Sequence, residues 1–116
     1  MKPATKITLT NGEELPFSFG MAALSNFLES ENMGLNDLGD LQNQLSLSRI
    51  MRILYYGFAD GHRREKMPYS LTVDDIGDLI DDNPNLITEC LDIFAKSMPA
   101  AEKGNGSKAA KVRKVS

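Results

Sequence analysis

The stretch from 48 to 94 constrains the fold of this chain most, because three helix boundaries can be read from it. Gly61 follows the last apolar residue of a long periodic run, where a left-handed helix stop is usual. Thr72 stands three residues before Asp75, which is the spacing of a capping box. The pair Asn83-Pro84 has the pattern of a cap followed by a first helical residue. The sequence therefore predicts three consecutive helices, the first of them capped by Ser48.

The first of these helices is apolar around most of its circumference. Its polar positions form one narrow stripe, Arg49, Arg52 and Tyr56, at i, i+3 and i+7. The apolar positions that we assign to the core are Ile50, Met51, Ile53, Leu54, Gly57 and Phe58. This helix is therefore predicted to be the central one of the domain.

The two helices that follow differ in their apolar faces. A rotation of about 100° per residue separates an apolar side (Val73, Ile76, Leu79, Ile80) from an acidic side (Asp74, Asp75, Asp78, Asp81, Asp82). The helix from 84 to 97 has a broader apolar arc, made by Leu86, Ile87, Cys90, Leu91, Ile93 and Phe94. That arc is wider than one packing contact needs, so we assign Leu86, Ile93 and Met98 to partner binding, together with Arg52 and Tyr56 of the polar stripe.

A β-hairpin is predicted upstream, over residues 5–19. Apolar residues alternate on both sides of Asn11-Gly12, the favoured two-residue turn. Such a ribbon is marginal by itself and needs helices to cover its apolar side. Met21 to Glu31 is predicted to supply one, with Gly34 as its stop and an inward stripe of Met21, Leu24, Phe27 and Leu28. Asn36 is predicted to cap a further short helix through Leu45.

Charge divides the chain into two unlike parts. Residues 100–116 hold five cations against Glu102, a balance of +4, which leaves −7 for residues 1–99 because the whole chain carries −3. The basic part has almost nothing to bury and is predicted to be a disordered tail. We therefore expect one α+β, mainly helical domain over 1–99, with the hairpin packed on four to five helices from 21 to 98. No run of the chain is apolar enough for a membrane span, and no signal peptide is evident, so we expect a cytoplasmic protein.

Catalytic and metal-binding signals are weak. Cys90 lies among apolar residues of a helix and is predicted to be a buried structural thiol, and His62 has no ligand or triad partner at a suitable spacing. Asp81, Asn83, Asn85 and Asp92 fall at calcium-loop positions, but Leu86 stands where that loop needs glycine. We expect no catalytic residue, no cofactor and no metal.

The segment LYYGFADG followed by YSLTVDDIGDLID resembles the tail assembly chaperones of long-tailed bacteriophages. The resemblance spans about residues 5–98 and is carried by Leu54, Gly57, Phe58, Leu71, Thr72, Asp75, Ile76, Gly77, Leu79 and Ile80. It departs from the family pattern where Phe58 replaces leucine, where Asp75 replaces glutamate, and in a more basic loop from Gly61 to Tyr69.

The resemblance implies a chaperone that binds and solubilises the long helical tape-measure protein in the cytoplasm of a host bacterium. It also implies a homo-oligomer and, in many family members, a longer frameshifted form that engages the tail tube protein. It implies neither catalysis nor a membrane. The alternative is a small phage-encoded nucleic-acid-binding or regulatory protein that uses the basic loop around His62, Arg63, Arg64 and Lys66 and the basic tail. A DNA reader is disfavoured because its recognition helix would turn five aspartates toward phosphates.

Overall fold

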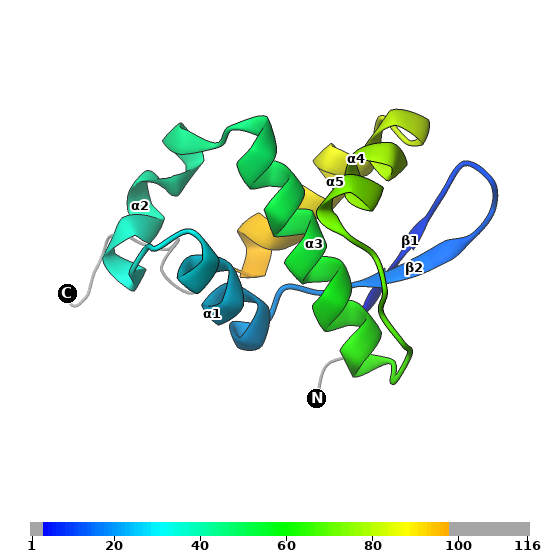
Figure 1. Ribbon diagram of the computed structural model, residues 1–116, viewed down its shortest axis with the longest axis horizontal. Coiled ribbons are helices and arrows are strands. Elements are labelled where there is room, and N and C mark those ends of the chain that lie inside the picture. The colour runs from blue at the N-terminus through cyan, green and yellow to red at the C-terminus, as the bar shows by residue number, and fades with distance from the viewer. Residues whose placement is uncertain (1–3, 98–116) are drawn as a thin grey trace.

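The computed structural model describes residues 4–97, and it has the predicted α+β, mainly helical architecture (Figure 1). A two-stranded antiparallel ribbon precedes five α-helices and two short 3-10 helices. The elements are β1 (Thr5–Thr8), β2 (Glu14–Phe17), α1 (Met21–Ser30), η1 (Leu35–Asp37), α2 (Leu38–Leu41), η2 (Gln42–Gln44), α3 (Leu47–Arg64), α4 (Val73–Asp82) and α5 (Leu86–Ser97). Met98 and the predicted tail over 100–116 lie outside the described residues.

The predicted hairpin is present, but its turn has three residues instead of two. The strands pair from Thr5 opposite Phe17 to Thr8 opposite Glu14. Beyond them, the amide of Leu9 donates to the carbonyl of Glu13 at 2.7 Å, and Gly12 takes a φ of +90°. The Asn11 side chain accepts a hydrogen bond from the Glu13 amide at 2.9 Å, which closes the wider turn.

Helix α3 crosses the middle of the molecule and is longer at both ends than predicted (Figure 1). Its cap is Ser46 and not Ser48, because the Ser46 hydroxyl accepts from the Arg49 amide. Gly61 does not stop the helix. The left-handed residue after the helix is Lys66, with a φ of 58°. Gly61 is needed for a different reason, which is the close approach of β2.

Strand β2 lies directly against α3 along a contact that we call the glycine seam: Gly57 and Gly61 of α3 against residues 16–18. A Cβ on Gly61 would lie 2.2 Å from the carbonyl oxygen of Pro16, and one on Gly57 would lie 2.1 Å from the ring of Phe17. The Ser18 amide donates to the carbonyl of Gly57 at 3.1 Å. Backbone can approach this closely only where the helix has no side chain.

Aromatic rings join the hairpin to the helices around α3. Phe17 packs edge-to-face on Phe58, with ring centroids 5.1 Å apart. Phe19 does the same with Phe94 of α5 at 4.8 Å, and Phe27 of α1 lies 6.3 Å from both rings. These five side chains are fully or almost fully buried, so α1, α3, α5 and the hairpin share one core.

The predicted inward stripe of α1 is confirmed at three positions, and the prediction is wrong at Met21. Leu24, Phe27 and Leu28 are buried, but Met21 is 62% exposed and Ala23 takes its place in the core. The helix ends at Ser30, and the left-handed residue that follows it is Asn32, with a φ of 58°, and not Gly34. An asparagine accepts the left-handed conformation more readily than other residues with a side chain, which explains the earlier stop.

The segment after α1 is also capped differently from the prediction. The amide of Gly34 donates to the Asp37 carboxylate at 2.8 Å, so Asn36 is not the cap. Instead of one short helix, the chain forms η1, α2 and η2 in succession. Leu38 and Leu41 are buried and Leu45 is half-buried.

Helix α4 begins as predicted, and the residue that follows its end is hydrogen-bonded to the hairpin. Thr72 and Asp75 form the capping box, with hydrogen bonds of 3.1 and 2.9 Å. Asn83, predicted as the cap of the next helix, is buried, and its amide oxygen accepts from the backbone N–H of Thr10 at 2.7 Å. Helix α5 begins at Leu86, two residues after Pro84.

Candidate functional site

Two buried carboxylates are the most highly connected polar groups among residues 4–97. Glu31, at the end of α1, receives hydrogen bonds from Arg49 and Arg52 of α3, and its side chain is 3% exposed. The Arg52 hydrogen bond is the main cause that lowers the pKa of Glu31, against an opposing effect of burial. The Arg49/Arg52 stripe therefore closes the junction of α1 and α3.

Asp60 of α3 is the second carboxylate, with a side chain that is 2% exposed. It accepts hydrogen bonds from the Ser18 hydroxyl, the Gly20 amide, Arg63 and Arg64. Burial by itself would raise the pKa of Asp60, but these hydrogen bonds outweigh it and hold the pKa below its ordinary value. A carboxylate this well satisfied is a structural anion, because its lone pairs are already occupied.

The basic loop expected around His62 does not form as predicted. His62 is buried in the last turn of α3, with Nδ1 2.7 Å from the carbonyl oxygen of Phe58 and the ring against Tyr69. Arg63 and Arg64 both pair with Asp60. Two of the three cations proposed for nucleic-acid contact in this loop are therefore held in ion pairs with one buried carboxylate.

No catalytic constellation is assembled from the predicted candidates. Cys90 is buried as predicted, and burial raises the pKa of its thiol far above the usual range, so it stays protonated. Within residues 4–97, no group of three or more His, Cys, Asp or Glu side chains is placed to hold a metal ion. Asp92 of the calcium register pairs with Lys96 instead.

An apolar hollow of about 420 Å³ lies between α1 and η1. We call it the methionine groove, and its lining is Met21, Leu24, Ser25, Leu28, Glu29, Met33, Gly34 and Leu35. Met21 and Leu35 stand at its edge, 62% and 61% exposed. Large apolar side chains this exposed beside a hollow are typical of binding surfaces, and methionine adapts to varied partners.

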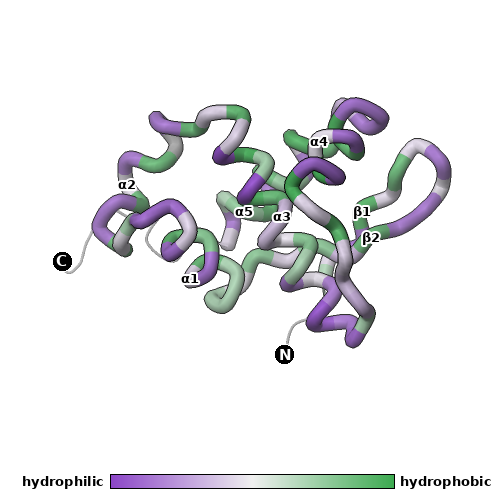
Figure 2. The backbone as a smooth tube through the Cα atoms, in the orientation of Figure 1, coloured by the Kyte–Doolittle hydropathy of each residue, from purple (hydrophilic) through white to green (hydrophobic). Residues whose placement is uncertain are grey.

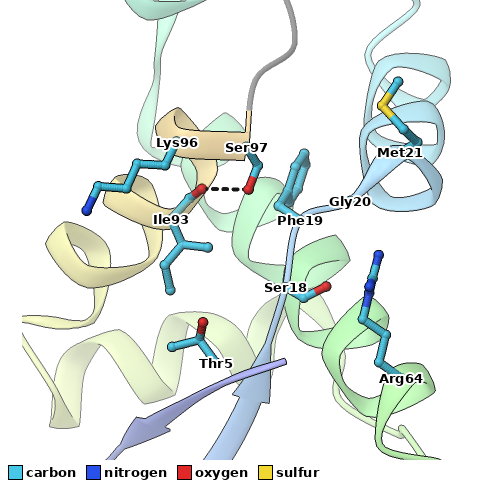
Figure 3. A pocket seen from close by; sticks show the side chains of 9 residues that line it. All are labelled: Thr5, Ser18, Phe19, Gly20, Met21, Arg64, Ile93, Lys96 and Ser97. Atoms are coloured by element: carbon cyan, nitrogen blue, oxygen red, sulfur yellow. Dashed lines mark hydrogen bonds between the residues drawn. The ribbon is translucent and has the colours of Figure 1, made fainter. Parts of the chain in front are cut away.

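Met21 also lines a second hollow, of about 380 Å³, between the start of α1 and the end of α5 (Figure 3). Figure 3 shows Met21 on one side of this α5 hollow, Ile93 on the other and Phe19 between them. Arg64 reaches its lower edge beside Gly20, whose missing Cβ leaves room for the guanidinium. The methionine groove and the α5 hollow are therefore neighbours that share one exposed apolar side chain.

The predicted partner-binding residues divide into four groups. Leu86 is 1% exposed and belongs to the core, so it is not part of a surface, and a charged residue there is expected to unfold the domain. Ile93 is half-buried and lines the α5 hollow. Arg52 holds Glu31, and Tyr56 packs on Tyr55 with centroids 5.0 Å apart. Met98 lies outside the described residues.

The sequence analysis missed the two carboxylates and the methionine groove. Asp60 carries a local signal, because Arg63 and Arg64 follow at i+3 and i+4. Glu31 carries none, since its partners lie 18 and 21 positions away. Met21 fell on the helical stripe assigned to the core, and only the packing of α5 and η1 decides that it stays outside.

A third groove, of about 490 Å³, lies between the start of α3 and α4. We call it the acidic groove, and its lining is Leu47, Met51, Asp74, Gly77, Asp78, Ile80 and Asp81. Leu47 is 62% exposed. Figure 2 shows that hydrophobic and hydrophilic residues are mixed along α4. The lining of the groove combines both kinds, with Leu47, Met51 and Ile80 beside three aspartates.

Comparisons with known protein families, with curated proteins and with solved structures found no match to this chain. Within residues 4–97, no helix combines the length and the apolar character that crossing a membrane requires.

Proposed function

We propose that this protein is a chaperone for an apolar helical client, and specifically a phage or prophage tail assembly chaperone that binds and solubilises the tape-measure protein in the host cytoplasm. The observation that carries the proposal is the exposure of Met21 at the junction of the methionine groove and the α5 hollow. The proposal includes no catalytic step and no cofactor.

The residues that carry the family resemblance support a shared fold more than a shared contact surface. Leu54, Gly57, Phe58 and Ile76 are buried, and Gly57 is required by the glycine seam. Thr72 and Asp75 start α4. The contacts to a client therefore belong to other residues, which are free to differ between chaperones with different clients.

The methionine groove has the chemistry that a helical client needs. An amphipathic helix binds by placing apolar side chains into a groove at helical spacing. Leu24 and Leu28 form an apolar floor, and Met21, Met33 and Leu35 surround it with side chains that adjust to different shapes. Ile93 extends the apolar surface into the α5 hollow.

Size makes several copies per client necessary. The described domain is 46 Å in its longest dimension, and a helix rises about 1.5 Å per residue, so one copy covers at most about 30 residues of helix. A tape-measure protein of many hundred residues therefore needs an array of chaperones. The acidic surface of the domain keeps such a complex in solution.

Co-expression with the long helical protein encoded beside this gene tests the proposal. We expect the partner to become soluble and to elute with several copies of this protein in size-exclusion chromatography. Met21→Lys should reduce the recovered complex by about tenfold, the effect of losing a central apolar anchor. The matched control is Met67→Lys, because Met67 is also exposed, at 45%, but lines none of the three grooves.

The variants also separate loss of binding from loss of folding. Met21 is largely exposed, so Met21→Lys should leave the melting temperature unchanged. The chaperone proposal fails if the partner stays insoluble with the wild-type protein, or if Met67→Lys weakens the complex as much as Met21→Lys does. Binding that disappears steeply with added salt and follows nucleic acid instead would favour the alternative function.

A further inference from the structure

Among the described residues, the lining of the acidic groove includes three aspartates and no lysine or arginine. Asp74, Asp78 and Asp81 follow each other at i, i+4 and i+7 on one side of α4, and all three are exposed. No ion pair within residues 4–97 involves them. The four described arginines and Lys96 pair with other carboxylates, and the two remaining described cations, Lys6 and Lys66, do not line the groove.

The groove is also apolar at its floor, which distinguishes it from an ordinary solvated acidic face. Leu47, Met51 and Ile80 line it, and Gly77 in the middle of α4 leaves it open. Met51 is the nearest side chain to Gly77, since a Cβ there would lie 3.0 Å from the Met51 methyl group. An occupant must therefore combine small apolar side chains with several cations.

The sequence after α5 has this combination. Residues 108–115 read KAAKVRKV, with cations at 108, 111, 113 and 114 and small apolar residues between them. Lys108 and Lys111 are three positions apart, as are Asp78 and Asp81 on α4. Val112 and Val115 are also three positions apart. The four cations face a groove edged by three carboxylates, so the charges are complementary.

The connection is long enough for this segment to reach the groove. Lys108 lies eleven positions after Ser97, the last residue of α5, with ten residues between them. An extended chain of that length spans up to about 36 to 40 Å, while the domain measures 46 × 30 × 24 Å. Attachment to the same chain also raises the local concentration of the segment, which allows weak contacts to suffice.

We propose that residues 108–115 of this chain dock into its own acidic groove and cover Leu47 and Ile80. The basic segment thereby neutralises the aspartate edge of α4 and shields an apolar floor that is otherwise open. This inference does not depend on the chaperone function, because the acidic groove and the methionine groove have no lining residue in common.

Paramagnetic labelling of the full-length protein tests the docking. A nitroxide is attached to Gly106→Cys, and the native Cys90 does not interfere, because it is buried and its thiol stays protonated. At low salt we expect the label to broaden the amide signals of α4 and of the first turn of α3. The broadening should disappear at about 1 M salt, where exposed charges are screened beyond about 3 Å.

A charge-matched pair of variants shows whether the groove itself is responsible. The triple variant Asp74→Asn, Asp78→Asn, Asp81→Asn should lower the ratio of docked to free segment by roughly three- to tenfold, as expected for losing three exposed ion pairs. The control replaces Glu13, Glu29 and Asp40 by their amides. It changes the net charge equally, removes three exposed carboxylates outside the groove, and should leave the broadening intact.

Three outcomes would overturn the proposal. The first is the absence of localised broadening at low salt. The second is equal loss in the groove variant and in the control, which would indicate attraction to net charge alone. The third is broadening that appears only when spin-labelled and isotope-labelled chains are mixed, because the segment would then occupy a second copy and not its own groove.

Discussion

Helix α3 makes a tight contact with β2 and a loose one with α4, although a glycine lies at both. At the glycine seam, a Cβ on Gly61 would lie 2.2 Å from a backbone oxygen of Pro16. At the α4 contact, a Cβ on Gly77 would lie 3.0 Å from the terminal methyl group of Met51. Backbone cannot move aside without moving the strand, whereas a methionine side chain can rotate away. Glycine is therefore required at position 61, whereas at position 77 a larger residue could be accommodated.

Burial follows the same division. Phe17 and Phe58 on either side of the seam are fully buried, while Ile76 is the only buried residue of α4. The acidic groove lies beside this looser contact. The α3–β2 unit therefore fixes the fold, and α4 is held less firmly, in a position where its exposed side remains available for binding.

The largest loss of stability is expected when a buried side chain is removed from the contact between α3 and β2. Phe58→Ala removes a fully buried ring that packs on Phe17, so it should lower the free energy of unfolding by about 3 to 5 kcal/mol. On the exposed side of α4, Asp78→Asn should change it by less than about 0.5 kcal/mol. Urea denaturation measures both. A smaller effect at position 58 than at position 78 would refute the assignment of the two regions.

Adding a methyl group to the seam tests the same contact from the opposite direction. Alanine at position 61 would favour the helix by about 1 kcal/mol, but the Cβ has no room against Pro16. We expect Gly61→Ala to destabilise the protein by about 3 kcal/mol, at the upper end of the range for overpacking. A stabilised Gly61→Ala variant would show that β2 can move away from α3, and the seam would not be tight.

The ion pairs that hold α3 to its neighbours predict a pH dependence. The pKa values of Glu31 and Asp60 are lowered in the folded protein, so their contributions are fully present above the unfolded pKa, about 4. Those contributions are lost as the pH falls through the folded pKa values. The melting temperature should therefore drop between roughly pH 5 and pH 2.

The variant Asp60→Asn isolates one of these contributions. It should lower the free energy of unfolding by about 2 kcal/mol at pH 7, because the hydrogen bonds from Arg63 and Arg64 lose their charged acceptor. Its melting temperature should also fall less steeply with acid than that of the wild type. Parallel acid curves for the two proteins would contradict the role assigned to Asp60.

The fold class can be predicted from the sequence because the local signals agree with it. The role of Gly61 and the exact ends of the helices cannot be predicted in the same way. The capping box at Thr72 and the alternation of the hairpin act within a few residues and were predicted correctly. Gly61 was read as a stop, because nothing nearby in the sequence reveals that Pro16 lies against it. Glu31 and the exposure of Met21 likewise depend on residues far along the chain. The helices and strands are therefore predictable from neighbouring residues, whereas the candidate site depends on contacts between residues far apart in the sequence.

The smallest effect, and the one of opposite sign, is expected at the loose contact. In Gly77→Ala the new methyl group meets only the end of the Met51 side chain, which has three rotatable bonds. Alanine at the centre of α4 gains up to about 1 kcal/mol of helix propensity, and a small readjustment of Met51 takes part of that gain. We expect a net stabilisation of about 0.5 kcal/mol, measured by urea denaturation beside Gly61→Ala. Both variants make the same chemical change in a helix that faces a neighbour, so the opposite signs would arise from the neighbour alone. If Gly77→Ala is as destabilising as Gly61→Ala, α4 packs on α3 as tightly as β2 does, and the contrast between the two regions is wrong.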